Sequence, residues 1–153
     1  MSEKKLSGKV AMITGGARGL GRGYALRLAG LGADIAIVDR NLKAAEVYEF
    51  EKEQMTASTV MDECEALGVR AIGLEADLTD REVTKKAVAH IVEKMGHIDI
   101  TVCNAGGGIA KFADELGTNG PGRDINTSAT PADCPQETLT RVLEINLMTC
   151  IYT

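Results

Sequence analysis

The sequence contains no tryptophan, and two phenylalanines and three tyrosines make up its aromatic content. The core must therefore be built from aliphatic side chains. Long hydrophobic runs are also lacking, because the strictly apolar stretches reach about four residues, far fewer than the roughly 18 of a membrane-spanning helix. The polar start, MSEKKLSGK, lacks the apolar segment of a secretory signal. These absences argue against a membrane partner and predict a cytoplasmic protein.

Positive charge is scarce and scattered. Seventeen Lys and Arg residues against 22 Asp and Glu residues give a net charge of −5, and basic clusters do not exceed a pair. A nucleic acid is therefore not an expected partner. The cysteines have neither CxxC spacing nor nearby histidine pairs, so we expect no metal site and reduced thiols that mostly serve packing. They are Cys64, Cys103, Cys134 and Cys150, and the last two have no assignable role.

The 153 residues allow one domain, since domains usually have roughly 100–200 residues. Short aliphatic runs alternate with longer segments of helical periodicity, which predicts an α/β fold with a parallel sheet. Strands are expected at 10–14, 35–38, 70–74 and 98–103. Helices are expected at 20–31, in two pieces within 41–67 with a break near 56–58, from a capping box at 79–82 to Gly96, and from about Pro135. A long irregular loop is expected from Gly107 to Asp133.

Two helices show a clear apolar pattern. In the first, we expect a stripe made of Leu20, Tyr24, Leu28 and Leu31 to face the sheet. In the helix that ends at Gly96, the expected apolar face consists of Val83, Ala87, Val88, Ile91 and Met95. The last helix carries Leu139, Val142, Leu143 and Leu147.

The strongest motif is TGGARGLG, from Thr14 to Gly21, between the first strand and the first helix. Glycines permit a tight turn and let a diphosphate approach the N–H groups at a helix N-terminus, where the helix dipole favours negative charge. The sequence therefore predicts a dinucleotide site, and an ordinary glycine-rich turn is the alternative. The motif residues assigned to the cofactor are Gly15, Arg18, Gly19, Leu20 and Gly21.

Two acidic residues follow the second and third strands. Asp39 lies eighteen residues after Gly21, where a carboxylate can accept both ribose hydroxyls of an adenosine. It would repel the additional phosphate of NADP, so NAD is the predicted cofactor, although Arg18 and Arg40 supply compensating charge. Asp39 could instead be a turn residue. Asp77 could hold the adenine edge while Leu78 packs nearby, or it could cap the following helix.

The order of these landmarks resembles that of the short-chain dehydrogenases/reductases, over essentially the whole chain. Asn104-Ala105-Gly106 and Ile145-Asn146 complete the pattern. The resemblance implies a Rossmann-like, doubly wound sheet with strand order 3-2-1-4, in which Gly15, Gly19 and Gly21 cradle the diphosphate. Asn104, Ala105 and Gly106 would line the path to the nicotinamide. Asn146 matches the catalytic-site asparagine, which holds a water in the proton relay and kinks its helix.

The sequence departs from the family pattern in its catalytic residues. In the family, the Tyr-x-x-x-Lys pair and its upstream serine belong to a fifth strand and helix, which are not found here, and Tyr152 has no lysine four positions later. The stretch Asn41 to Thr59 is also longer than the usual link. In the implied strand order, the strand at 98–103 has an open edge, which natural proteins avoid. We therefore expect a companion C-terminal segment or second chain, self-association, or a truncated product of a longer enzyme.

The resemblance implies an NAD-dependent oxidoreductase. It would move a hydride between a secondary alcohol or ketone and the nicotinamide once a further segment supplies Ser, Tyr and Lys, and it would form a homo-oligomer, a dimer or a tetramer. A non-catalytic NAD-binding regulatory or structural subunit is the alternative. A methyltransferase also places an acidic residue after its second strand, but the TGxxxGxG spacing and the Asn104-Ala105-Gly106 element disfavour it.

Overall fold

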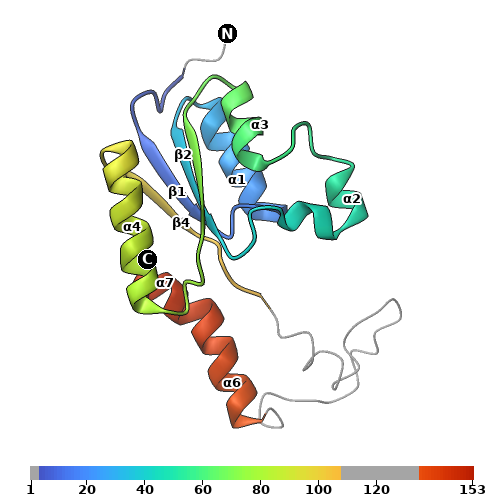
Figure 1. The fold of residues 1–153 in the computed structure, drawn as a ribbon, viewed down its shortest axis with the longest axis vertical. Helices are drawn as coiled ribbons and strands as arrows, with labels where there is room; N and C mark the ends of the chain where they lie inside the picture. The colour runs from blue at the N-terminus through green and yellow to red at the C-terminus, as the bar shows by residue number, and fades with distance from the viewer. Residues whose placement is uncertain (1–3, 108–134) are drawn as a thin grey trace.

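The computed structural model describes residues 4–107 and 135–153. Its centre is a four-stranded parallel sheet in the order β3-β2-β1-β4, which confirms the predicted order (Figure 1). Thr14, at the end of β1, lies opposite Val38 on one side and Cys103 on the other. The strands are β1 (Val10–Thr14), β2 (Asp34–Asp39), β3 (Ala71–Glu75) and β4 (Ile100–Cys103).

Helices connect the strands and follow the last one. They are α1 (Gly19–Gly30), the 3₁₀ helix η1 (Ala44–Val47), α2 (Glu49–Lys52), α3 (Val60–Ala66), α4 (Arg81–Met95), α6 (Gln136–Leu143), the π-helical η3 (Glu144–Met148) and α7 (Thr149–Tyr152). The stretch 41–67 thus holds three helical pieces instead of two, with the predicted break near 56–58. The expected loop after Gly107, and Cys134, lie outside the described residues.

The sheet separates two hydrophobic clusters. Ala11, Ile13, Ile35 and Ile37 face α1 and α3, whereas the alternate residues Val10, Met12, Ala36 and Val38 face α4. Figure 1 shows α4 on one side of the sheet and α1 on the other. Because β1 and the interior of β2 are covered on both faces, their residues are apolar without alternation, as expected for a parallel sheet.

The predicted apolar stripe of α1 is wrong for Leu20 and Tyr24, whereas Leu28 is partly buried and packs against the cluster that contains Ile13 and Ile35. Leu20 is 74% exposed and Tyr24 is 44% exposed, and the buried residues are Gly21, Ala25 and Ala29. These small residues recur every four positions, so they form one face that lets the helix approach the sheet closely. In α4 the prediction is largely confirmed, because Ala87, Ile91 and Met95 are buried, but Thr84 is buried beside them.

The predicted capping box at 79–82 is also wrong. Asp80 is the N-cap of α4, and its Oδ1 accepts hydrogen bonds from the N–H groups of Glu82 (2.8 Å) and Val83 (3.1 Å). Thr79 instead donates its hydroxyl to Asp77 Oδ1 at 2.7 Å. Asp80 takes the cap because it lies one residue nearer the first turn, within reach of two free N–H groups.

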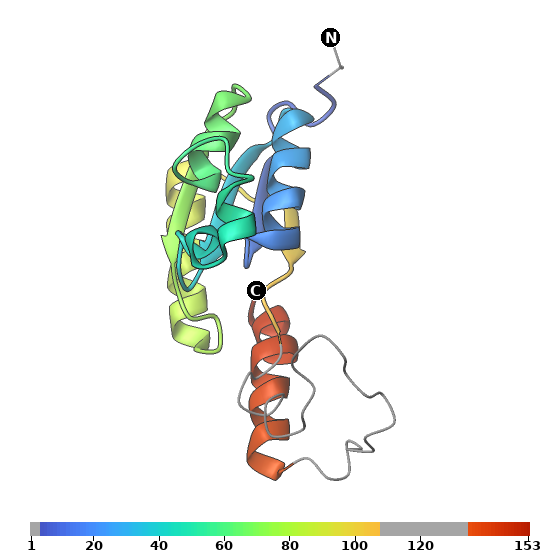
Figure 2. The same cartoon turned by 90° about the vertical axis from the view of Figure 1, so that its right-hand side faces the viewer.

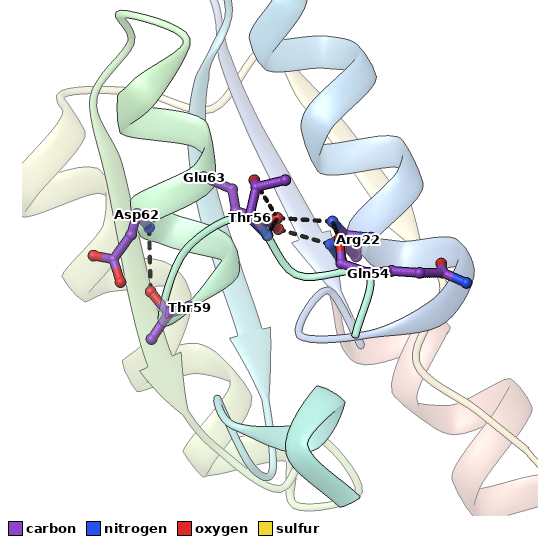
Figure 3. A network of polar contacts seen from close by, with 6 residues as sticks. All are labelled: Arg22, Gln54, Thr56, Thr59, Asp62 and Glu63. Atoms are coloured by element: carbon purple, nitrogen blue, oxygen red, sulfur yellow. Dashed lines mark hydrogen bonds and ion pairs between the residues drawn. The ribbon is translucent and has the colours of Figure 1, made fainter. Parts of the chain in front are cut away.

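A buried ion pair fixes the segment between η1 and α3 against α1 (Figure 3). Arg22 donates from Nε to Glu63 Oε2 and from Nη2 to Glu63 Oε1, both at 2.7 Å. Glu63 Oε1 also accepts from the N–H (2.7 Å) and the hydroxyl (2.8 Å) of Thr56, and Arg22 Nη2 donates to the carbonyl of Gln54 at 2.9 Å. The network therefore joins α1, α3 and the connecting turn, and the side chain of Glu63 is only 1% exposed.

The C-terminal helical segment extends away from the sheet in both views (Figures 1 and 2). α6 and η3 expose Leu139, Leu143 and Leu147 on one side. Within residues 4–107 and 135–153, β4 is an edge strand of the sheet. No helix of this described part combines the length and apolar character needed to cross a membrane.

Candidate functional site

A cleft of about 860 Å³ lies at the carboxyl ends of the four strands. Parallel strands bring the loops that follow them to one edge of the sheet, where open α/β folds bind their ligands. The described lining residues are Gly15, Arg18, Gly19, Leu20, Val38, Asp39, Arg40, Asn41, Ala44, Tyr48, Ala76, Asp77, Leu78, Thr79, Asn104, Ala105, Gly106, Gly107, Ile145 and Thr149. The cleft therefore brings together all the predicted cofactor residues except Gly21, which is buried beneath the turn.

The glycine-rich turn forms one wall of the cleft. Gly15 has a φ of +63° and Gly19 a φ of +52°, both in the left-handed region that favours glycine. A Cβ on Gly21 would overlap the carbonyl oxygen of Gly15. No described side chain caps the start of α1, and its first turn contains no acidic residue. The first N–H groups of the helix and its positive dipole end are therefore left for an anion.

Thr14 and Asn104 join this turn to the end of β4. Thr14 Oγ1 accepts hydrogen bonds from the N–H groups of Asn104 and Ala105, both at 3.0 Å. Asn104 Nδ2 donates to the carbonyl of Gly15 at 2.9 Å. The sequence analysis did not assign Thr14 a role, although its place as the first residue of the TGGARGLG motif was a usable signal.

Asp39 holds its carboxylate against the glycine-rich turn. Oδ2 accepts a hydrogen bond from Ala17 N at 3.1 Å, and Oδ1 accepts one from Asn41 N at 3.2 Å. Each carboxylate oxygen has a further lone pair, so the group can still accept hydrogen bonds from a ligand. Its neighbour Arg40 is exposed at the same end of the cleft.

Asp77 is fixed by Thr79 and does not cap α4. Its Oδ1 accepts the Thr79 N–H at 3.0 Å as well as the Thr79 hydroxyl. These two hydrogen bonds hold the pKa of Asp77 below its ordinary value, so the carboxylate is charged at neutral pH. Leu78 beside it is buried and packs with the cluster under α4. Of the two roles that the sequence left open, the helix cap is wrong, because Asp80 caps the helix.

Asn146 lies in the π-helical segment η3, and π-helical turns are among the places where helices kink. Its Nδ2 donates to the carbonyls of Val142 (2.9 Å) and Gly107 (3.0 Å), and its Oδ1 accepts the Gly107 N–H at 2.9 Å. Both amide hydrogens are thus used, which leaves Oδ1 to accept from a further donor. A Cβ on Gly106 would lie 2.5 Å from Asn146 Oδ1, so only glycine allows this approach.

Arg18 and Tyr48 also line the cleft and contact each other. The Arg18 guanidinium carbon lies 3.9 Å from the centre of the Tyr48 ring. Arg18 also pairs with Glu51, with Nε 3.1 Å from Oε2 and Nη2 3.3 Å from Oε1. Sequence reasoning missed Tyr48 and Glu51, because both lie in the long 41–59 segment, where no motif marks them. Across the described residues, no cluster of His, Cys, Asp and Glu is placed to hold a metal ion.

Comparison with known proteins agrees with this geometry. A family model described as short chain dehydrogenase matches residues 9–153. Cyclohexanol dehydrogenase from Rhodococcus sp. (strain TK6) is 51% identical over 104 residues, which are 68% of this chain and 38% of that protein. The matched residues are therefore well under half of that relative.

Two solved structures share the fold over 97% of this chain. The NAD⁺-bound xylitol dehydrogenase has a TM-score of 0.71 and 28% identity, with 46% of its chain covered. The NADPH-dependent 3-quinuclidinone reductase from Rhodotorula rubra has a TM-score of 0.66 and 26% identity, also with 46% of its chain covered. Structures of this type are therefore known with either nicotinamide cofactor.

Proposed function

The chain belongs to the short-chain dehydrogenase family, and from this premise we propose that it is the cofactor-binding part of an NAD-dependent oxidoreductase acting on secondary alcohols or ketones. The observation that carries the proposal is the pairing of an uncapped, glycine-rich helix start with the Asp39 carboxylate. The first offers N–H groups to a diphosphate, and the second offers acceptors to ribose hydroxyls. The similarity to cyclohexanol dehydrogenase supports the substrate class.

The described residues fit the cofactor, because Gly15 and Gly19 line the cleft without side chains and no described side chain caps the start of α1. In the proposed arrangement, the turn from Gly15 to Gly21 holds the diphosphate and Asp39 accepts the ribose hydroxyls. Asp77 and Leu78 hold the adenine. The bound nicotinamide would supply hydride transfer. Asn104, Ala105 and Gly106 form the wall beside it, and Asn146 accepts a hydrogen bond from a water in the proton relay through Oδ1.

The proposal includes what completes the site. The family's tyrosine and lysine carry the acid-base chemistry and belong after the fourth strand, where this sequence contains no Tyr-x-x-x-Lys pair. The same spacing occurs at Tyr48 and Lys52, but these residues follow β2. We propose that a C-terminal segment or a second chain supplies the catalytic tyrosine and lysine with the serine, and that the completed enzyme is a cytoplasmic homo-oligomer. The proposal of a further segment is supported by the relative, of which the matched residues cover only 38%. The proposal of a homo-oligomer is supported by the exposed leucines of α6 and η3. A non-catalytic NAD-binding subunit is a second candidate, because the residues after β4 do not supply the Tyr-x-x-x-Lys pair.

Ligand titration tests the proposal without the catalytic residues. We expect calorimetry with this chain to show binding of NAD, weaker binding of NADP and none of S-adenosylmethionine. Binding of S-adenosylmethionine alone would contradict the proposed function. Adding a polypeptide that contains the Tyr-x-x-x-Lys pair should then give NAD reduction with cyclohexanol as the substrate. A completed assembly that binds NAD but oxidises no alcohol would favour the non-catalytic subunit.

Replacing Asp39 by alanine is expected to weaken NAD binding by about tenfold to a hundredfold, because hydrogen bonds to a charged group are lost. The same change removes the repulsion of a ribose phosphate, so the preference for NAD over NADP should relax. Dissociation constants for both dinucleotides give the result. Asp62→Ala, an exposed carboxylate lost from α3, is the matched control and should change neither constant. An unchanged NAD preference in Asp39→Ala would remove Asp39 from this role.

A further inference from the structure

The long segment 41–59 places a second carboxylate beside the cleft through Arg18. Glu51, in α2, has a side chain that is 12% exposed, whereas that of Arg18 is 37% exposed. The guanidinium therefore meets a largely desolvated carboxylate along one edge and the Tyr48 ring across one face. Two of the five N–H donors of Arg18, those on Nε and Nη2, therefore face Glu51.

Arg18 matters because of where it lies. It follows Ala17, whose N–H binds Asp39, so it adjoins the carboxylate that is proposed to hold the adenosine ribose. Arg18 and Arg40 are the two basic side chains among the described lining residues of the cleft. A phosphate on that ribose would need a guanidinium or ammonium group as its partner.

The charges at this end of the cleft then decide which dinucleotide is preferred. Arg18 and Glu51 cancel each other, and the positive charge of Arg40 is matched by the negative charge of Asp39, its neighbour in the sequence. An added phosphate therefore meets no net positive charge, and to bind Arg18 it must compete with Glu51 at about 3 Å. Without the Glu51 charge, the same site would carry a free guanidinium next to the ribose.

We propose that Glu51 is a positioning residue that sets the preference for NAD over NADP by occupying the Arg18 guanidinium. This inference rests on the proposed function. It adds a residue that sets the cofactor preference and that belongs neither to the glycine-rich motif nor to the end of β2, where Asp39 lies. Tyr48 contributes by holding the guanidinium plane against its ring, where Glu51 can reach the guanidinium edge.

The test compares Glu51→Gln with the unchanged chain by calorimetric titration of NAD, NADP and adenosine 2′,5′-bisphosphate. The substitution should lower the dissociation constants of NADP and the bisphosphate about tenfold and change that of NAD less than about twofold, because one charge next to the phosphate is removed. The gain should shrink as salt is raised, since the new attraction is screened. Glu53→Gln, an exposed glutamate two residues on, is the matched control and should change none of these constants.

A double variant separates this role from a structural one. In Arg18→Gln/Glu51→Gln the released charge is gone, so the ratio of the NADP and NAD constants should return to that of the unchanged chain. Thermal melting of each variant confirms that it is folded. A ratio that stays unchanged in Glu51→Gln, or a gain that persists in the double variant, would overturn this inference and leave the proposed function intact. If the unchanged chain binds no dinucleotide or prefers NADP, the proposed function fails first and this inference fails with it.

Discussion

Replacing Gly21 by alanine is expected to lower NAD affinity more than about a hundredfold and to destabilise the fold by about 3 kcal/mol, at the upper end for overpacked sites. The added Cβ would overlap the Gly15 carbonyl oxygen and lie 2.8 Å from Asn104 Nδ2. Neither group can yield cheaply, because one is backbone and the other donates to that same carbonyl. The turn must open, which moves the N–H groups proposed to hold the diphosphate. Calorimetric titration and urea unfolding measure the two effects.

Gly23→Ala provides the matched control on the same helix. A Cβ at position 23 meets no atom within 4 Å, so the substitution has only its effect on helix propensity. It should stabilise the chain by roughly 0.5–1 kcal/mol and leave NAD affinity unchanged. Near-normal NAD binding by a folded Gly21→Ala variant would contradict the role proposed for this turn.

The sheet and the cleft were predictable because their signals are local. The aliphatic runs at 10–14 and 35–38 are short and rich in β-branched residues, which favours buried strands, and a glycine-rich turn between a strand and a helix indicates where a ligand approaches. The strand order followed from the family resemblance, and it is confirmed. Positions that follow a strand, such as Asp39 and Asn104, then meet at one edge of the sheet.

The features that the sequence did not predict are contacts that depend on side-chain size or on residues far apart in the sequence. In α1 the sequence pattern favoured Leu20 and Tyr24, but the close approach of the helix to the sheet selects the small side chains of Ala25 and Ala29. The hydrophobicity of a residue does not indicate how large a side chain fits between the helix and the sheet. Glu51 reaches Arg18 across 33 residues of sequence, and no periodicity marks such a pair. The burial of Glu63 beside Arg22 was unpredictable for the same reason.

Replacing Glu63 by glutamine is expected to destabilise the chain by about 3–5 kcal/mol, the usual loss when one partner of a buried ion pair is removed. Arg22, whose side chain is only 18% exposed, would keep its charge without a carboxylate. The N–H and the hydroxyl of Thr56 would also donate to a neutral amide oxygen in place of a charged carboxylate oxygen, which weakens both hydrogen bonds. Urea unfolding at neutral pH measures the loss.

Two further variants make this result specific to the pair. Glu65→Gln removes an exposed charge from the same region, and it should change the unfolding free energy by no more than about 0.5 kcal/mol. Arg22→Met/Glu63→Met replaces both charges with apolar side chains and should recover much of the stability lost in the single variant. A double variant no more stable than Glu63→Gln would show that the unpaired charge of Arg22 is not the source of the loss.

The pH dependence of the Glu63→Gln effect tests the charge itself. Burial alone would raise the pKa of Glu63, but the hydrogen bonds from Arg22 and Thr56 outweigh it and hold the pKa below its ordinary value. Such a group contributes stability that is fully present above its unfolded pKa, about 4.3, and is lost as the pH falls through the lower folded value. The unchanged chain should therefore lose its advantage over Glu63→Gln progressively below about pH 4.3. Because other carboxylates titrate equally in both proteins, the difference between their unfolding curves isolates Glu63. A destabilisation that stays constant down to acid pH would mean that shape, and not charge, accounts for it.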